Sequence, residues 1–138
     1  MIVLDTNIIS ALMQPQPNDK VIAWLDIQQP RDLYLPSIVI AEIRYGLQRM
    51  PVGVRQVALS QQFLLLVHSL FADRILPFGQ HEADAYAVLR AARESMGRPM
   101  SMGDAQIAAI AHVHHYAVAT RNIKNFEGCG IGLINPFE

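Results

Sequence analysis

Short apolar runs alternate with longer amphipathic segments along this chain. Runs without polar interruption are typical of strands buried on both faces of a parallel sheet, and they predict strands over 2–4, 33–35, 117–120 and 133–134, with a short extended piece over 75–78. Apolar residues recurring every three to four positions predict helices over 7–13, 18–28, 38–50, 54–71, 80–95 and 102–115. This alternation predicts an α/β fold, a short and mainly parallel central sheet flanked by helices.

Proline, glycine and asparagine mark the boundaries between these segments. Asn18 follows a proline-containing break and is expected to cap the second helix. Pro36 should end the second strand, and Ser37 is expected to cap the helix that follows it. In the 80–95 helix, the helical period comes from Ala83, Tyr86, Ala87, Leu89 and Arg90.

Length and composition indicate one domain over residues 1–138, with 51% hydrophobic and 17% charged residues. The net charge of -1 gives no global attraction to nucleic acid. The single Cys129 excludes an intrachain disulfide and a thiolate metal cage. No signal peptide is expected, because the apolar opening ends at Asp5, and no apolar run approaches the roughly 20 residues of a membrane span. We therefore expect a cytoplasmic protein without a membrane partner.

Three acidic residues lie beside apolar segments where a soluble domain gains nothing obvious from them. Asp5 follows the first strand, and ligands of open α/β sheets bind at the carboxyl ends of strands. Glu42 and Asp104 lie in apolar helical segments, and helical spacing places each beside apolar neighbours. We therefore expect both helical carboxylates to point inward and to meet Asp5.

Convergence of three carboxylates has a predictable electrostatic consequence. At about 4 Å and an effective dielectric of about 20, each like-charged pair costs roughly 4 kcal/mol. Either the pKa values rise or a cation binds, and a set of oxygen ligands favours Mg²⁺ or Mn²⁺. Such an ion lowers the pKa of water and neutralises charge on a phosphate, which suits phosphoryl chemistry.

Each carboxylate also has a purely structural interpretation. Asp5 can cap the helix that follows it, and Asp104 can form a capping box with Ser101. Glu42 can pair with an arginine, such as Arg44 or Arg121. These alternatives remain open from the sequence.

Histidines offer a second metal hypothesis. His112 and His115 are one helical turn apart, but a borderline metal site usually needs a third ligand, and the HExxH arrangement is absent. A helix C-terminus lined by imidazoles is the favoured interpretation.

Segments spread over nearly the whole chain carry a family resemblance. They are 2–7 (IVLDTN), 42–46 (EIRYG), 103–109 (GDAQIAA), 119–122 (ATRN) and 134–137 (INPF). In this order they resemble the PIN domains, in particular the VapC-type toxins, including the FitB-like branch, of bacterial toxin–antitoxin systems.

The resemblance implies a metal-dependent ribonuclease with three or four acidic ligands for one or two Mg²⁺ or Mn²⁺ ions. Asp5, Glu42 and Asp104 match the acidic positions. Asn7 and Thr120 match positions that orient those carboxylates by hydrogen bonds.

The loop after the 117–120 strand departs from the family pattern. Asn122 stands at the fourth acidic position, so one negative charge is missing there. Arg121 can contact the substrate phosphate, or form a surface salt bridge instead.

The implied reaction is endonucleolytic hydrolysis of an RNA phosphodiester by a metal-activated water, leaving a 5′-phosphate and a 3′-hydroxyl. The resemblance also implies a cognate antitoxin and a homodimer or dimer of heterodimers. Ile8, Ile9, Leu12, Met13 and the 38–50 helix are candidates for an antitoxin groove, with ordinary core packing as the alternative.

Two other functions compete with the nuclease hypothesis. A receiver-type phospho-acceptor domain would need a second acidic residue after the first strand and a lysine near the last, whereas this chain offers Asp5 and Arg121. A non-catalytic PIN-like module that binds RNA or a partner is favoured by Asn122.

Overall fold

A five-stranded sheet forms the centre of the protein, which is represented by a computed structural model that describes all residues from 1 to 138. The strands are β1 (Ile2–Leu4), β2 (Leu33–Pro36), β3 (Ile75–Leu76), β4 (Ala117–Ala119) and β5 (Leu133–Ile134). Their order is β3-β2-β1-β4-β5, and every pair is parallel. The predicted α/β fold with a mainly parallel sheet is confirmed.

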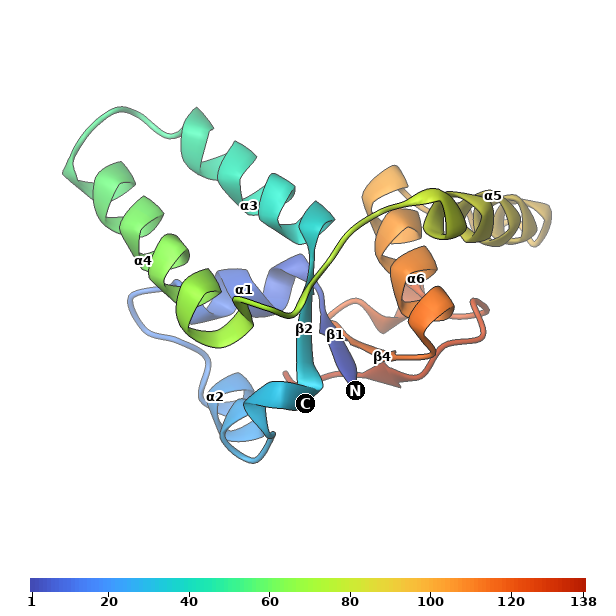
Figure 1. The fold of residues 1–138 in the computed structure, drawn as a ribbon, viewed down its shortest axis with the longest axis horizontal. Helices are drawn as coiled ribbons and strands as arrows, with labels where there is room; N and C mark the ends of the chain where they lie inside the picture. The colour runs from blue at the N-terminus through green and yellow to red at the C-terminus, as the bar shows by residue number, and fades with distance from the viewer.

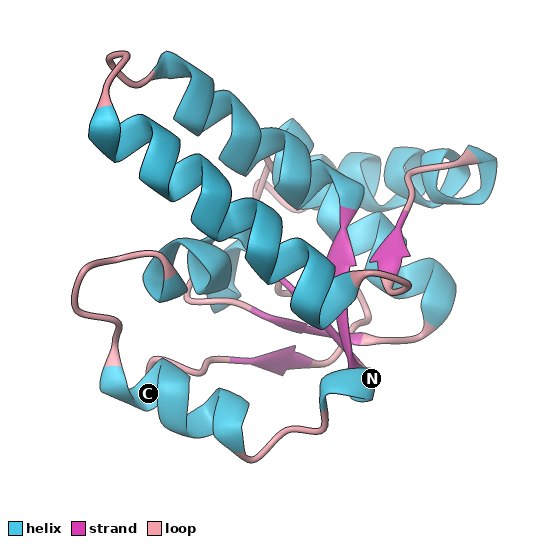
Figure 2. Cartoon of the chain, turned by 60° about the vertical axis from the view of Figure 1, so that its left-hand side comes forward, coloured by secondary structure: helices cyan, strands magenta, loops and turns pink.

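Six α-helices surround this sheet, together with two short 3₁₀ helices (Figures 1 and 2). The α-helices are α1 (Thr6–Leu12), α2 (Asp19–Asp26), α3 (Ser37–Arg49), α4 (Val54–Phe71), α5 (Gln80–Ser95) and α6 (Met102–His114). The 3₁₀ helices are η1 (Pro30–Asp32) and η2 (Ile123–Asn125). In Figure 1, α3 and α4 lie side by side to the left of β1 and β2, and α5 and α6 lie to the right.

A side chain caps the N-terminus of three of the six α-helices: α1, α2 and α6. Asn18 accepts hydrogen bonds from the N–H groups of Lys20 and Val21, so its predicted capping role is confirmed. The prediction for Ser37 is wrong. Ser37 is already the first residue of α3, Pro36 occupies the cap position, and no side chain caps this helix.

The predicted period of α5 is only partly right. Tyr86 and Leu89 pack against the core, but Ala83 and Ala87 are exposed. The buried residues of this helix are Glu82 and Arg93, whose long polar side chains reach into the protein. A pattern that counts only apolar residues misses such a face.

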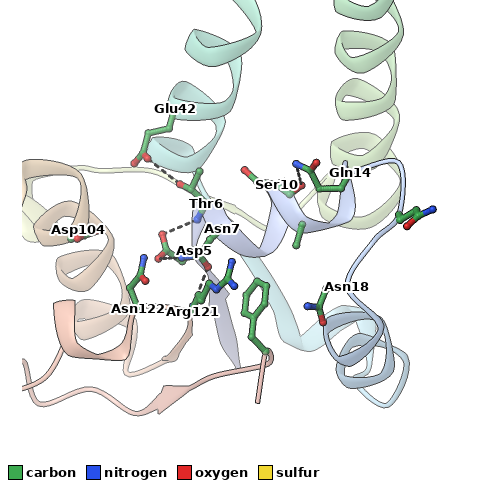
Figure 3. A pocket seen from close by; sticks show the side chains of 13 residues that line it. Asp5, Thr6, Asn7, Ser10, Gln14, Asn18, Glu42, Asp104, Arg121 and Asn122 are labelled. Carbon is green, nitrogen blue, oxygen red and sulfur yellow. Dashed lines mark hydrogen bonds between the residues drawn. The ribbon is translucent and has the colours of Figure 1, made fainter.

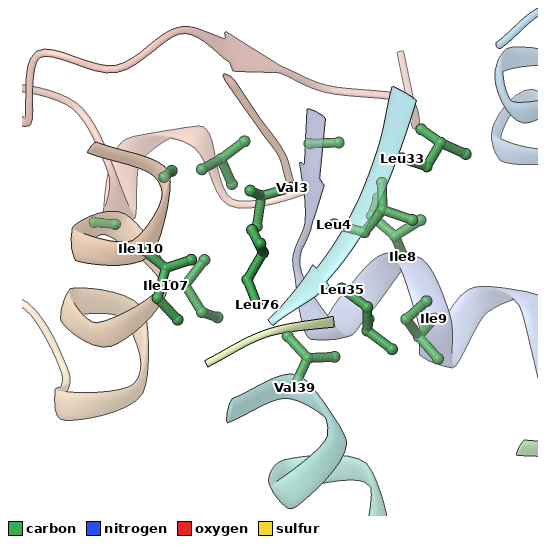
Figure 4. Close-up of a cluster of buried hydrophobic side chains, with 14 of the residues drawn as sticks. Val3, Leu4, Ile8, Ile9, Leu33, Leu35, Val39, Leu76, Ile107 and Ile110 are labelled. Carbon is green, nitrogen blue, oxygen red and sulfur yellow. The ribbon is translucent and has the colours of Figure 1, made fainter. Parts of the chain in front are cut away.

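The hydrophobic core lies on both faces of the sheet (Figure 4). Val3, Leu4 and Leu35 come from the strands, while Ile8 and Ile9 come from α1, and all five are fully buried. The idea that Ile8 and Ile9 line an open groove is therefore wrong, and core packing is confirmed for both.

No helix is long and apolar enough to cross a lipid bilayer.

Candidate active site

The carboxyl ends of β1 and β4 bring Asp5 and Thr120 together. Leu4 pairs with Ala119 in the parallel register, and the N–H of Asp5 donates to the carbonyl of Ala119 at 3.0 Å. Asp5 and Thr120 are therefore adjacent at one edge of the sheet although they are 115 positions apart. This edge is the usual ligand-binding edge of open α/β sheets.

Hydrogen bonds fix both oxygens of Asp5 (Figure 3). Oδ1 accepts from the N–H of Thr6 at 2.7 Å, so Asp5 does cap α1. Oδ2 accepts from Thr120 Oγ1 at 2.8 Å and from Asn7 Nδ2 at 3.3 Å. Asn7 in turn accepts from the N–H of Arg121 at 3.1 Å through Oδ1. The Asp5 carboxylate thus caps α1 and is held in one orientation by the same set of hydrogen bonds.

Glu42 reaches the same place from the first half of α3. Its Oε2 accepts a hydrogen bond from Thr6 Oγ1 at 3.1 Å, and Oε1 faces Gly103 at the start of α6. The expectation that Glu42 leans into the protein is wrong, because the residue is exposed and only its carboxylate turns toward Asp5 and α6. Thr6 was missed by the sequence analysis, although its position directly after Asp5 was a usable signal.

Asp104 lies in the first turn of α6. Its N–H donates to Ser101 Oγ at 3.2 Å, so the expected cap by Ser101 is present. The residue is half-buried, and burial raises the pKa of its carboxyl, while hydrogen bonds with Ser101 and Asn125 and the charge of Arg93 oppose that rise. Asp104 thus has a structural role at the start of α6, as Asp5 has at the start of α1.

One cavity of about 620 Å³ joins these side chains. The candidate residues that line it are Asp5, Asn7, Glu42, Asp104, Arg121 and Asn122. Thr120 is not part of the lining and is fully buried behind Asp5. The structure therefore brings the three carboxylates predicted to converge into one open, polar space.

The cavity concentrates negative charge. Burial raises the pKa of Asp5 to about 6, the bonds from Thr120 and Thr6 oppose this rise, and the charges of Asp104 and Glu42 add to it. None of the three salt bridges of the protein involves a cavity carboxylate, so the suggested pairing of Glu42 with Arg44 or Arg121 does not occur. The three carboxylates therefore form no ion pair within the protein, although Arg121 lines the same cavity.

The donor set suits a hard divalent cation, because every donor is an oxygen. No three His, Cys, Asp or Glu side chains lie close enough together to hold one metal ion. His112 and His115 therefore have no third side chain of these types beside them to complete a metal site. Mg²⁺ is commonly bound by one or two carboxylates and keeps several waters, so an all-protein cage is not required. The residues present therefore fit a partly hydrated ion.

A buried arginine supports the far wall of the cavity, and the sequence analysis did not identify it. Arg93 on α5 donates from Nε to the carbonyl of Arg98 at 2.7 Å and from Nη1 to the carbonyl of Asn125 at 3.1 Å. It also donates to the carbonyls of Glu127 and Lys124. These bonds fix the loop that carries Asn122 and Asn125. Nothing local in the sequence separates Arg93 from an ordinary surface arginine.

Fold and cavity together define a class: a small α/β protein with an acidic cavity at the carboxyl edge of a parallel sheet. The chain belongs to the PIN domain family, since the sequence model of that family matches residues 2–127. It is 41% identical to VapC ribonuclease Y4jK of Sinorhizobium fredii and 39% identical to toxin FitB of Neisseria gonorrhoeae. Each alignment covers 100% of this chain and 99% of the relative.

Solved structures agree with this membership. The crystal structure of FitAcB from Neisseria gonorrhoeae superposes with a TM-score of 0.94 at 38% identity, covering 100% of this chain and 99% of that chain. VapBC-5, a member of the VapBC family of toxin–antitoxin systems from Mycobacterium tuberculosis, shares the fold with a TM-score of 0.71 at 22% identity, covering 96% of each chain. The predicted resemblance to VapC-type and FitB-like toxins is confirmed, and the receiver-type alternative is set aside.

Proposed function

We propose that this protein is a divalent-metal-dependent endoribonuclease and the toxin of a toxin–antitoxin pair, acting as one domain. The observation that carries the proposal is that Asp5, Glu42 and Asp104 line one cavity and that none of the three forms a salt bridge. A full-length relative at 41% identity is a VapC ribonuclease, and another at 39% is the toxin FitB, which supports the same activity and role here.

In the proposed mechanism, Asp5, Glu42 and Asp104 would hold one or two Mg²⁺ or Mn²⁺ ions, directly or through water. A bound ion lowers the pKa of water and neutralises phosphate charge. Asp5 is kept in one orientation by Thr120, Thr6 and Asn7, so its oxygens do not rearrange when substrate enters.

The remaining polar residues of the cavity act on the RNA. Arg121 is exposed and forms no salt bridge, which leaves its guanidinium free to bind a phosphate of the substrate. Asn122 offers a neutral amide where a fourth carboxylate would add charge, so a second ion should bind more weakly than the first.

We further propose that the toxin is held inactive in the cytoplasm by a cognate antitoxin and assembles as a homodimer or a dimer of heterodimers. The name of toxin FitB and the VapBC toxin–antitoxin neighbour support this biology. Leu12 and Met13 are only half-buried, so they and α3 stay available as antitoxin contacts, unlike Ile8 and Ile9.

The test is cleavage of a fluorescent RNA by the purified protein with and without Mg²⁺ or Mn²⁺. The Asp5→Asn and Asp104→Asn variants should lose cleavage by at least about a hundredfold, because each removes a ligand charge. A matched control is Asp73→Asn, which changes an exposed carboxylate that lies outside the cavity. Undiminished cleavage by both cavity variants would refute the assignment.

The same assay addresses the alternative of a non-catalytic binding module, which is favoured by the neutral Asn122. That alternative expects RNA binding without cleavage in every metal tested. It also expects Asn122→Asp to leave cleavage absent, whereas the nuclease should bind metal more tightly with this change.

A further inference from the structure

One arginine is buried in this protein, and no carboxylate pairs with it. Arg93 has 3% of its surface accessible and is the one basic side chain among the buried residues. None of the three salt bridges includes it. Removing an unpaired guanidinium from water is costly, and an apolar side chain would fill the same space without that cost. Arg93 is therefore expected to contribute something that an apolar side chain cannot.

The donors of Arg93 bridge two segments that are far apart in the sequence. Nε donates to the carbonyl of Arg98 at 2.7 Å, in the turn that leads from α5 to α6. Nη1 donates to the carbonyl of Asn125 at 3.1 Å and also to that of Glu127. Nη2 donates to the carbonyl of Lys124 at 3.4 Å. A planar fork with five N–H donors can make all these bonds at once, whereas a lysine ammonium has three donors at a single point.

The two bridged segments meet at Asp104. Three positions after Arg98 in the first segment, Ser101 Oγ accepts from the N–H of Asp104 at 3.2 Å. From the second segment, the side chain of Asn125 donates a hydrogen bond to the Asp104 carboxylate. Arg93 therefore holds the backbone on both sides of the contact between Asn125 and Asp104.

The second segment is attached to the protein without Arg93 as well. Phe126 is fully buried in the hydrophobic core, and its N–H donates to the carbonyl of Ile123 at 2.9 Å. Glu127 forms a 2.7 Å salt bridge with Arg98. Attachment alone therefore does not require a buried guanidinium. What the fork of Arg93 adds is a fixed orientation of the Asn125 peptide beside Asp104.

We propose that Arg93 is a positioning residue for the acidic cavity, which it does not itself line: it holds Asn125 against Asp104 and so fixes the direction in which the Asp104 carboxylate faces a divalent cation. The inference rests on the proposed metal-dependent function and adds a residue that acts on the site from behind it. Removal of partners that orient a metal ligand typically weakens metal affinity about 10- to 100-fold.

The experiment measures the Kd of Mn²⁺ for the full chain, purified without metal, by isothermal titration calorimetry. The variants are Arg93→Lys, which keeps the charge and removes the fork, Asn125→Ala, and the two changes together. Each single change should weaken Mn²⁺ binding about 10-fold. The double variant should also lose about 10-fold rather than about 100-fold, because both changes interrupt the same connection to Asp104.

Arg98→Gln is the matched control. It removes a salt bridge to the same loop but no hydrogen bond to Asn125, so the Kd of Mn²⁺ should not change. An unchanged Kd in folded Arg93→Lys or in Asn125→Ala overturns the inference, and so does a double variant whose loss is the product of the two single losses. An equal loss in Arg98→Gln would mean that any loosening of the loop weakens the site, which also overturns it. If Arg93→Lys does not fold, Asn125→Ala still gives a result that supports or overturns the inference.

Failure of the proposed function gives a different result. Mn²⁺ binding in the expected pattern without RNA cleavage counts against the ribonuclease function and leaves the inference standing. If the unmodified protein binds no Mn²⁺, the proposed metal dependence fails, and NMR of the Asn125 side-chain amide then tests the inference without metal. Its signals should shift in Arg93→Lys and in Asp104→Asn but not in Arg98→Gln; signals that stay unshifted in Arg93→Lys overturn the inference.

Discussion

Thr120 Oγ1 donates a 2.8 Å hydrogen bond to Oδ2 of Asp5, and both residues are buried. This bond opposes the rise in the pKa of Asp5 that burial produces. The same hydroxyl accepts from the N–H of Asn122 at 3.0 Å. Thr120 therefore links the orientation of one carboxylate to the position of the loop on the other side of the cavity.

Replacement of Asp5 by Asn should stabilise the metal-free protein at neutral and alkaline pH. The folded-state pKa of Asp5 is raised to about 6, so folding favours the protonated carboxyl. The free energy of unfolding is therefore unaffected by this group below about pH 4, and it falls as the pH rises from there through 6. The free energy of unfolding falls by about 3 kcal/mol in this way, whereas the neutral amide of Asn does not ionise and leaves it unchanged. Asn is also a good helix cap, so α1 should be retained.

The measurement is urea unfolding of both proteins in a chelator from pH 4 to pH 8. The advantage of Asp5→Asn should be absent near pH 4 and should grow toward pH 8. Parallel stability curves over this range would show that the pKa of Asp5 is not raised in the folded protein.

Replacement of Thr120 by Val should raise the pKa of Asp5 further, because the shape is kept and one hydrogen bond to the charged form is lost. The N–H of Asn122 also loses its acceptor, so we expect a stability loss of about 1–3 kcal/mol. Carboxyl-carbon NMR titration of Asp5 in the metal-free protein measures the shift. Thr120→Ser keeps the hydroxyl and is the control; a pKa that is the same in the Val and Ser variants would contradict the argument.

The parts of the fold that could be predicted follow from local patterns. The bounds of α4 and α5 match the sequence prediction, because turn residues such as Gly53 mark the breaks between periodic segments. The strands were identifiable because β1 and β4 are buried, uninterrupted apolar runs. Asp5 was identifiable because it ends such a run.

The parts that could not be predicted depend on contacts between distant segments. Glu42 has apolar neighbours, which predicted an inward residue, yet its position is set by Thr6 and Gly103 from two other elements. Arg93 is buried, and three of its four acceptors are the carbonyls of Lys124, Asn125 and Glu127, which lie 31 to 34 positions further along the chain. Helical periodicity carries no information about partners at such separation.

Replacement of Gly103 by Ala should lower activity without unfolding the protein. A Cβ at this position would lie 3.0 Å from Glu42 Oε1, which is tighter than an ordinary contact, so the carboxylate must move. The obstacle is the end of a flexible side chain, so stability should change by less than about 1 kcal/mol, whereas displacement of Glu42 should cost about 10-fold or more in kcat.

Gly46→Ala provides the matched control within α3. Nothing lies within 4 Å of a Cβ at Gly46, so this change should stabilise the helix by about 0.5–1 kcal/mol and leave cleavage unchanged. The two variants are compared by thermal unfolding and by single-turnover cleavage. Equal cleavage rates for the two variants would show that the position of the Glu42 carboxylate does not affect catalysis.

Replacement of Arg93 by Met should loosen the loop from Lys124 to Glu127 and destabilise the protein by about 2–4 kcal/mol. Met preserves much of the apolar stem but leaves the carbonyls of Arg98 and Asn125 without their donor, and buried acceptors without partners are costly. Arg98→Gln is the control, because the Arg98–Glu127 salt bridge is partly exposed and should contribute at most about 1 kcal/mol. Hydrogen exchange should show faster opening of this loop in the Met variant alone; equal protection in both variants would mean that Arg93 does not hold the wall of the cavity.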